Sequence, residues 1–304
     1  MEELPAVYCG ASENHIHYDN FVLKEGEPMK PFMRDEVDEK CTWLDVKKCS
    51  GYIDSSTFTL FPCVEYITID ECIIQNCSPK AFEQLAKLKA LDIRNSEFPV
   101  KKNIFEGAKN VESLSISNFH FKDNDDIFSN LSGLLSLTLE NCTFGVIEKD
   151  MFSGLHTLKY LSINESKIDK ISSDCFNDLE NLEELGIRDN KIDEFDPKGI
   201  LKLINLKRLS LHNNETSSEI NYEIFQQLPA LESFLFDNII YESLDFSGFK
   251  TLKNVEIGFS KEKDDNTSKT AIFEKLKSMN IEYQFVFCGK VSFDKNNKDV
   301  MVCC

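Results

Sequence analysis

The chain has 304 residues, of which 41% are hydrophobic, and its 52 Asp and Glu outnumber its 34 Lys and Arg, for a formal net charge of −18 at pH 7. This is the composition of a globular protein and not of a disordered one. The acidic balance argues against nucleic acid as a main partner, because binding phosphates requires a basic surface. No apolar run reaches the roughly 18 residues that span a bilayer, so we predict no membrane insertion.

The first forty residues precede any regular pattern and contain one cysteine, Cys9. We predict that residues 1–40 form an N-terminal cap, since an array of repeats exposes its core at each end. The opening Met1–Pro5 lacks the apolar stretch of a signal peptide and is interpreted as the start of a mature or recombinant chain. His15-Ile-His17 could hold a metal, but two ligands are too few to predict a site, and we predict no metal and no cofactor.

A unit of the form apolar-x-x-apolar-x-apolar then recurs along almost the whole chain. The regular units begin 21 to 25 residues apart, at Val64, Leu88, Val111, Leu134, Leu158, Leu182, Leu206, Leu231 and Leu252. A degenerate first unit spans Cys41–Val46 and a last strand is expected within Ile281–Phe287, which makes ten or eleven coils. Each unit predicts a short strand whose apolar side chains point inward and whose polar side chains point outward.

An apolar residue, mostly Phe, stands six positions before most of these strands. These residues are Phe82, Phe105, Phe128, Phe152, Phe176, Ile200, Phe225 and Phe246. No single coil can bury its own apolar face, so we predict that they stack into a buried spine under the convex side of a solenoid.

The stretch from Phe152 to Phe195, FSGLHTLKYLSINESKIDKISSDCFNDLENLEELGIRDNKIDEF, keeps the Leu, Asn and Phe positions of two leucine-rich repeats of the roughly 24-residue type. The chain therefore resembles extracellular leucine-rich repeat (LRR) proteins such as Toll ectodomains and secreted insect leucine-rich immune proteins. The start, CTWLDVKKC and then VEYITIDECII, is similar to the diverged first repeats of insect members. Some mosquito members carry an adjacent Cys pair after the repeats, as Cys303-Cys304 stands here, but the coiled coil that often follows is absent.

The resemblance implies an α/β fold: an LRR solenoid over residues 41–287, curved as a horseshoe with a parallel sheet on its concave face. Cys-rich caps flank it, and residues 288–304 are the C-terminal Cys-containing tail. The resemblance also implies a ladder of Asn or Cys that hydrogen-bonds the turns of neighbouring coils. Its positions here are Cys49, Cys72, Ser96, Phe119, Cys142, Ser166, Asn190, Asn214 and Ile239.

The chain has 11 cysteines, clustered near both ends without zinc-site spacing. Disulfides in an oxidising compartment are the preferred interpretation and free thiols the alternative. The candidates for disulfides are Cys9, Cys41, Cys49, Cys63, Cys72, Cys77, Cys288 and Cys303. Cys142 and Cys175 are interpreted as buried thiols, whereas Cys49 and Cys72 are either ladder thiols or a pair. Because the total is odd, Cys304 is the candidate for an intermolecular disulfide and a covalent dimer.

Six Asn-X-Ser/Thr sequons agree with secretion, although a cytosolic protein remains an alternative. We predict glycans at Asn76, Asn130, Asn164 and Asn266. Asn141 carries a further sequon, and the sequon at Asn214 is discounted because a ladder Asn is buried. A glycan on Asn164 would lie in the middle of the concave face and move binding elsewhere, for example to the polar insertion GFSKEKDDNTSKT.

No catalytic spacing involves the five histidines, and no phosphate loop, His-Glu-x-x-His or Gly-x-Ser-x-Gly occurs, so we predict no enzyme. Function is assigned to the concave face, which is free to bind a protein ligand or a second LRR chain. The candidate residues are Tyr66, Arg94, Glu140, Tyr160, Arg188, Arg208, His212 and Asp237. Lys207, Arg208 and His212 form a basic cluster, and Tyr160, Arg188 and Arg208 are expected in one column of the sheet.

The leading hypothesis is a secreted, non-enzymatic protein that recognises other proteins in insect innate immunity or at a host–parasite interface. The alternatives are the detached ectodomain of a Toll-like or adhesion receptor, and an intracellular LRR scaffold with reduced thiols. An enzyme regulator or a toxin-like effector is also compatible with an LRR concave face.

Overall fold

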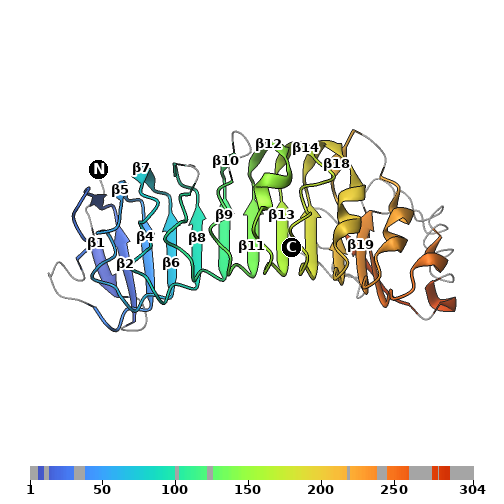
Figure 1. The fold of residues 1–304 in the computed structure, drawn as a ribbon, viewed down its shortest axis with the longest axis horizontal. Helices are drawn as coiled ribbons and strands as arrows, with labels where there is room; N and C mark the ends of the chain where they lie inside the picture. Colours follow the sequence, from blue (N-terminus) through green and yellow to red (C-terminus); the bar gives the residue numbers. More distant parts are fainter. Residues whose placement is uncertain are drawn as a thin grey trace, which may run out of the picture.

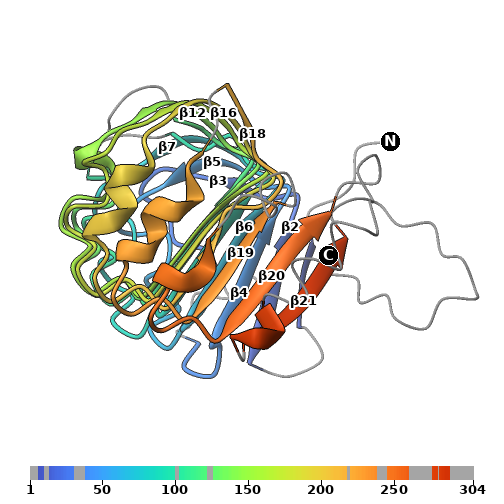
Figure 2. The ribbon, with the colours of Figure 1, turned by 90° about the vertical axis from the view of Figure 1, so that its right-hand side faces the viewer.

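The computed structural model describes residues 6–9, 14–30, 38–99, 103–121, 126–217, 220–237, 245–259, 276–279 and 281–287. Figure 1 shows the strands of one long sheet side by side in an arc, in the order in which they follow along the chain. Seen end-on in Figure 2, that sheet forms one side of the coil, and turns and short helices form the opposite side. No helix in these ranges has the length and apolar composition to cross a lipid bilayer.

The main sheet contains thirteen strands. In order across the sheet they are β1 Ala6–Cys9, β2 His15–Asp19, β4 Trp43–Lys47, β6 Tyr66–Asp70, β8 Ala90–Arg94, β9 Ser113–Ser117, β11 Ser136–Glu140, β13 Tyr160–Asn164, β15 Glu184–Arg188, β17 Arg208–Ser210, β19 Ser233–Asp237, β20 Asn254–Phe259 and β21 Glu282–Phe287. From β2 onward all neighbours are parallel and in residue-for-residue register, as in Leu137, Leu161, Leu185 and Leu209. Every strand that the repeat predicted is present, and the parallel solenoid is confirmed.

One strand of this parallel array was not predicted. β2 pairs with β4 in parallel, and β1 then pairs with β2 in antiparallel orientation. Ile16 and Tyr18 of β2 are buried, so this strand fills the inward positions of a coil. The repeat therefore begins at His15, inside the segment expected to be only a cap. Its two polar histidines and the 28 residues between His15 and Trp43 hide it from a search for regular spacing.

In many coils a second, shorter strand follows the main strand, and these second strands form two narrower parallel sheets. The first contains β3 Val22–Leu23, β5 Ser50–Ile53 and β7 Ile73–Cys77. The second contains β10 His120–Phe121, β12 Thr143–Ile147, β14 Lys167–Ile171, β16 Lys191–Phe195 and β18 Glu215–Thr216. In the coil between them, the described residues up to Pro99 form only an isolated bridge at Glu97, and Pro99 has no N–H to donate to a sheet.

Helix contributes little to the convex side. The helices described there are short 3-10 helices: η2 Lys149–Phe152, η3 Pro197–Lys202, η4 Tyr222–Gln227 and η6 Phe246–Gly248. Asp196, Asn221 and Asp245 precede the last three, and each side chain accepts a hydrogen bond from the helix's second residue. Within the described ranges, α-helix occurs only at residues 276–278.

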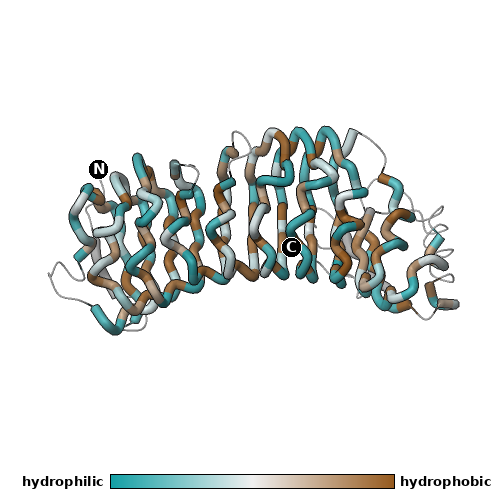
Figure 3. Tube along the Cα trace, viewed as in Figure 1, coloured by the Kyte–Doolittle hydropathy of each residue, from teal (hydrophilic) through white to brown (hydrophobic). Residues whose placement is uncertain are grey.

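The spine of aromatic residues is confirmed. All eight predicted members are at most 2% exposed. The rings of Phe128, Phe152 and Phe176 stack in sequence, with centroids 6.5 and 6.2 Å apart and planes within 10°. Phe58 continues the stack one coil before Phe82. Figure 3 shows the resulting pattern, in which apolar and polar residues alternate along the coils.

The ladder position connects successive coils through side-chain hydrogen bonds. The Asn190 side chain accepts from the Ser166 backbone N–H at 2.9 Å and donates to the Ile163 carbonyl at 2.9 Å. In the same way, the Asn214 side chain accepts from the Asn190 N–H and donates to the Ile187 carbonyl. The Ser166 hydroxyl accepts from the Cys142 N–H. At the other end of the array, Cys49 N–H donates to the Cys72 sulfur at 3.3 Å. These groups are inside the turns, where an unpaired N–H or carbonyl is costly.

The side chains of five of the predicted disulfide candidates lie among those described, and the disulfides themselves stay a prediction. Within the described residues, Cys41, Cys49, Cys63, Cys72 and Cys77 are not joined to one another, nor to Cys142 or Cys175. The Cys49 and Cys72 thiols donate to the Lys47 and Asp70 carbonyls at 3.2 Å, so the ladder uses them as hydrogen-bond donors. The side chains of Cys9, Cys288, Cys303 and Cys304 lie outside the described residues.

Burial keeps the other two thiols protonated. Burial raises the pKa of Cys142 to about 11 and also raises the pKa of Cys175. Both residues are at most 2% exposed, as predicted for structural thiols. A neutral thiol here packs as a small apolar group.

A left-handed residue follows almost every main strand and turns the chain into the ladder. These residues are Asn20, Lys48, Glu71, Asn95, Asn118, Asn141, Glu165, Asp189 and Asn213, with φ between 49° and 60°. Asn and Asp tolerate this conformation better than other residues with a Cβ, and six of the nine positions hold one of the two. The turn is therefore encoded in the sequence by residue type as well as by spacing.

We predict that Asn190→Ala lowers the free energy of unfolding by about 2 to 3 kcal/mol, because it leaves the Ser166 N–H and the Ile163 carbonyl buried and unpaired. Chemical denaturation followed by circular dichroism measures the change. Asn177→Ala is the matched control, since Asn177 is exposed, and it should change the value by no more than about 0.5 kcal/mol. Equal stability of the two variants would show that the ladder does not hold the coils together.

Candidate functional site

The outward side chains of the main sheet form three rows, which together we call the sheet face. The first row contains His15, Trp43, Tyr66, Ala90, Ser113, Ser136, Tyr160, Glu184, Arg208, Ser233, Asn254 and Glu282. The second row runs two residues later from His17 and Asp45, and the third two residues later again from Asp19 and Lys47. Because the apolar residues point inward, these rows carry whatever the solenoid presents on its concave side.

Aromatic residues line the N-terminal end of the first row. The rings of His15 and Trp43 stack with centroids 4.6 Å apart, and Tyr66 follows at 6.0 Å from Trp43. Trp43 and Tyr66 are 45% and 44% exposed, which is unusual for such large side chains. Tyr66 was predicted as a binding residue and Trp43 was not. Trp43 lies in a degenerate unit, so the sequence did not show whether its side chain points inward or outward, although it is the only tryptophan of the chain.

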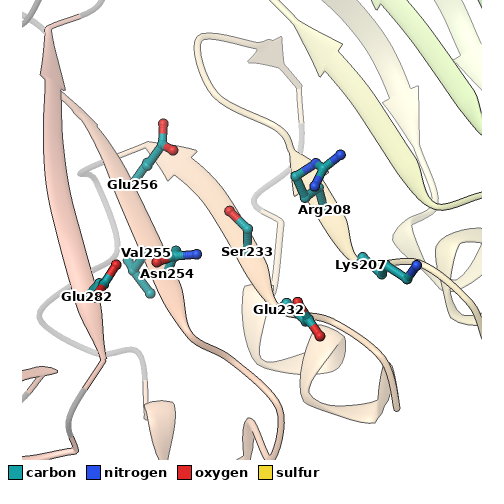
Figure 4. Close-up of a pocket in the computed structure, with 8 residues that line it drawn as sticks. All are labelled: Lys207, Arg208, Glu232, Ser233, Asn254, Val255, Glu256 and Glu282. Atoms are coloured by element: carbon teal, nitrogen blue, oxygen red, sulfur yellow. The ribbon is translucent and has the colours of Figure 1, made fainter.

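A hollow on the C-terminal half of the face brings the predicted anchors together. A groove of about 250 Å³ is lined by residues that include Tyr160, Arg188 and Arg208. A wider hollow of about 670 Å³ adjoins it, and Figure 4 shows charged side chains of both signs around it, among them Lys207, Glu232 and Glu256.

The expected single column is wrong in one respect. Tyr160 and Arg208 stand in the first row, two strands apart with Glu184 between them. Arg188 belongs to the third row, where it is aligned with Asn164 and donates to the Asn164 side chain at 3.3 Å. Arg208 forms an ion pair with Glu184. The three anchors thus surround the groove from two rows.

A row of charges of alternating sign borders the sheet face, one residue before the first row. It comprises Glu65, Lys89, Glu112, Lys159, Glu183, Lys207, Glu232 and Lys253, and the uncharged Leu135 stands between Glu112 and Lys159. Neighbouring members pair across coils, with Lys89–Glu65 at 2.8 Å and Lys207–Glu183 at 2.7 Å. The hydrogen bond from Lys207 lowers the pKa of Glu183. Exposed pairs of this kind contribute little stability. A row of like charges at these positions, however, would repel between neighbouring coils and destabilise the register.

His212 is not part of the predicted basic cluster. It is 9% exposed, and its Nδ1 lies 3.0 Å from the Ser210 hydroxyl. Burial lowers its pKa, so the ring is neutral near pH 7. The strand β17 ends at Ser210, but the His212 carbonyl still accepts from the Asp189 N–H, as the Arg188 carbonyl accepts from the Glu165 N–H. The His212 ring is buried because it lies back against Ser210. Lys207 and Arg208 remain exposed, and both are paired with glutamates.

The remaining predicted residues are spread over the face. Arg94 lies between Asp70 and Asp92, 3.7 Å from each carboxylate. Burial raises the pKa of Asp92. Glu140 is exposed in the third row of the middle coils. The side chain of Asp237 lies outside those described, although its backbone belongs to β19.

Of the predicted glycan sites, three fall on described residues. The side chains of Asn76, Asn130 and Asn164 are partly exposed. The Asn164 amide donates to the Ser162 hydroxyl at 2.8 Å and lies beside Arg188, so a glycan there would cover the groove. Asn214 donates twice to backbone carbonyls at 2.7 Å, which agrees with setting its sequon aside. Asn266 and most of the polar insertion lie outside the described residues.

One group of side chains in the described ranges could hold a metal ion: His15, His17 and Asp45. Burial and the neighbouring His15 lower the pKa of His17, whereas Asp45 raises it. Asp45 comes from the next coil, 30 residues after His15. The sequence showed the two histidines but not this third residue.

Two family models match the chain. "Leucine rich repeat" matches residues 132–192 and 180–238, and "BspA type Leucine rich repeat region (6 copies)" matches residues 38–144. The chain belongs to the leucine-rich repeat proteins. The matched region extends from residue 38 to residue 238 and contains the ladder hydrogen bonds and every spine residue except Phe246.

Solved structures with the same fold include Toll-like receptors in complex with ligands. The chain is 24% identical to TLR13 in a complex with ssRNA13, with a TM-score of 0.62 over 72% of this chain and 32% of that one. It is 16% identical to a chain of the Toll–Spätzle complex of Drosophila, with a TM-score of 0.57 over 72% of this chain and 30% of that one. The LRR protein thus spans about a third of each neighbour. No curated protein is significantly similar in sequence.

These neighbours bear on two predictions. LRR solenoids of this kind are typically binding modules without enzymatic activity. The complex with single-stranded RNA shows that nucleic acid can be a ligand of the fold, so its exclusion here rests on the net charge of −18 alone and stays a prediction.

Because His212 is buried in its neutral form, its lowered pKa predicts a loss of stability in acid. The unfolded chain takes up the proton at its ordinary pKa of about 6.5, whereas the folded chain takes it up only at lower pH. Stability from this group is therefore complete above about pH 6.5 and falls as the pH drops below it. Melting temperatures at pH 7.5 and 5.5 should differ less in His212→Gln than in the parent. His156→Gln, at an exposed histidine, should keep the parent's difference.

Proposed function

We propose that this LRR protein is a secreted, non-enzymatic binding protein that recognises a protein ligand with its sheet face. The observation that carries the proposal is the groove between Tyr160, Arg188 and Arg208, next to a wider charged hollow. Tyr and Arg are the residue types that most often dominate binding energy in protein interfaces. Tyr160 is 42% exposed, and Arg208 is exposed although it is paired with Glu184.

The fold supports this class of function. Toll is a structural neighbour whose solved complex contains Spätzle, which sets a precedent for a protein ligand on such a solenoid. A role in insect innate immunity or at a host–parasite interface is the specific form that we favour. One alternative is a detached ectodomain of a Toll-like or adhesion receptor. The other is an intracellular scaffold, in which cysteines are normally reduced.

An exchange of the charged pair tests the site without removing the pair. The double variant Glu184→Arg/Arg208→Glu keeps the net charge and an ion pair between β15 and β17, but it reverses the polarity at the edge of the groove. Loss of one anchor costs about 2 kcal/mol, roughly thirtyfold in affinity. We expect a ligand captured from the extracellular fluid of the source organism by the parent to be lost by this variant, with an unchanged melting temperature.

The matched control exchanges a pair outside the sheet face. Lys170 of β14 and Glu194 of β16 lie 2.7 Å apart on the narrower sheet, so Lys170→Glu/Glu194→Lys makes the same change elsewhere. This control should capture the ligand as the parent does. Equal capture by all three proteins would move the site off the groove, and captured material that disappears on RNase treatment would replace the protein ligand by RNA.

The secreted part of the proposal has its own test. The intact mass of the natural protein, measured before and after removal of N-glycans, should fall on deglycosylation, because Asn130 is a sequon with a partly exposed side chain. The same measurement after alkylation counts the thiols. A mass without glycans and with all eleven cysteines reduced would place the protein inside the cell.

A further inference from the structure

Two histidines and one aspartate meet at the N-terminal end of the sheet face. His15 and His17 point outward from β2, and Asp45 points outward from the neighbouring strand β4, directly opposite His17. His15 Nε2 and His17 Nδ1 both lie next to the same oxygen, Asp45 Oδ2, at 3.0 and 2.9 Å. All three ligand atoms are within 4.8 Å of one another. The parallel register brings together residues that are 30 positions apart in sequence.

These side chains are held in place. They are only 20%, 21% and 24% exposed, although they belong to the outer face of a sheet. The Trp43 ring stacks on His15, and its indole Nε1–H donates to Asp45 Oδ1 at 3.0 Å. That hydrogen bond occupies the second carboxylate oxygen and leaves Oδ2 facing the two imidazoles. A ligand carboxylate oriented by an outer donor is a usual feature of protein metal sites.

The donor set selects the class of ion. Imidazole nitrogen is a ligand for Zn²⁺ and other first-row transition metals, whereas Ca²⁺ and Mg²⁺ prefer an all-oxygen environment. At a metal–ligand distance of about 2.0 to 2.1 Å, ligand atoms lie about 2.9 Å apart at an octahedral edge and about 3.4 Å apart in a tetrahedron. The observed separations of 2.9 and 3.0 Å from nitrogen to oxygen are close to this range, so small side-chain rotations would admit an ion.

The surroundings favour a cation as well. Asp70 and Asp92 lie on the next two strands of the same face, with Arg94 as their counter-ion, in a chain of net charge −18. Acidic side chains near a site raise the local concentration of divalent cations.

We propose that His15, His17 and Asp45 bind one divalent transition-metal ion of the Zn²⁺ class. Three protein ligands leave at least one coordination position for water or for a ligand atom of a partner, since they come from one side, the surface of the sheet. This inference is independent of the groove around Arg208, which belongs to strands at the other half of the face. The alternative is a carboxylate that accepts hydrogen bonds from two imidazoles and binds no metal.

Trp43 provides the readout. It is the only tryptophan of the chain and contacts both His15 and Asp45, so its fluorescence reports on this site alone. The untagged protein, treated with a chelator and dialysed, is titrated with Co²⁺ and with Zn²⁺. We expect Co²⁺ to quench Trp43 at one ion per chain, Zn²⁺ to displace it, and calorimetry to give the same stoichiometry.

Three variants assign the ligands. Asp45→Asn and His17→Gln should each weaken Zn²⁺ binding by about a hundredfold or more, since loss of an outer partner alone costs about ten- to a hundredfold. Trp43→Phe removes the donor to Asp45 Oδ1 and should weaken binding about tenfold, measured by calorimetry. His156→Gln, at an exposed histidine on a turn, is the matched control and should bind as the parent does. Circular dichroism checks that each variant is folded.

Two results would overturn the proposal. One is a parent protein whose Trp43 fluorescence and calorimetric trace do not respond to either ion, which leaves the hydrogen-bonded cluster as the explanation. The other is binding that Asp45→Asn and His17→Gln both retain. In that case a sulfur-to-cobalt charge-transfer band in the near ultraviolet would assign the ion to cysteine thiols, because the proposed site contains no sulfur.

Discussion

The structure depends on the hydrogen bonds that each coil provides to the turn of the coil before it. A flat solenoid coil buries the backbone of its turn, and those N–H and carbonyl groups cannot reach water. Asn190 satisfies two such groups of the preceding coil, because one amide both accepts from the Ser166 N–H and donates to the Ile163 carbonyl. Where a thiol occupies the position, as at Cys72, its sulfur accepts from the Cys49 N–H and its S–H is 3.3 Å from the Val46 carbonyl, so both groups of the preceding coil have a weaker partner. The ladder therefore accounts for the burial of Cys49 and Cys72, two of the disulfide candidates.

Because other parts of each coil stabilise the fold, the side chains of the sheet face are not needed for its stability. The inward residues and the Phe spine make the core, the ladder satisfies the turns, and the row from Glu65 to Lys253 opposes register shifts. Side chains of the three outward rows can then vary at little cost in stability. Trp43, Tyr66 and Tyr160 are exposed on this face, although burial of large aromatic rings stabilises a fold. Their exposure is easier to explain by binding than by folding.

Most of the fold could be predicted because the same residue types recur at the same positions of successive units. Eleven strands, the spine and the ladder were each visible as a residue type at a fixed distance from the start of a unit. The errors concern the surroundings and the row of single residues within that period. His212 was expected to be exposed on the sheet face, but its ring lies against the Ser210 hydroxyl and is buried. Arg188 was assigned to the column of Tyr160, although their positions within the strand differ by four residues.

The candidate site was less predictable, because its contacts join different coils and need the register. The row of alternating charges is in the sequence, yet only stacked coils show that its members are neighbours. Asp45 could not be connected with His15 and His17 until β2 was known to pair with β4. The same holds for the disulfides: spacing placed Cys49 and Cys72 within reach of each other, but spacing cannot distinguish a bond from two thiols that donate to backbone carbonyls.

The sheet face has two chemically different ends, and this limits what can bind it. Trp43 and Tyr160 are five strands apart, about 24 Å at the spacing of a parallel sheet. After Tyr66, the part of the first row before Tyr160 holds only Ala90, Ser113 and Ser136, whose small side chains offer little contact area. A small molecule can contact one end only, whereas a folded protein or a second solenoid can reach both. An imidazole–carboxylate cluster at one end and a groove of paired charges at the other therefore favour a ligand of protein size, anchored at two separate points.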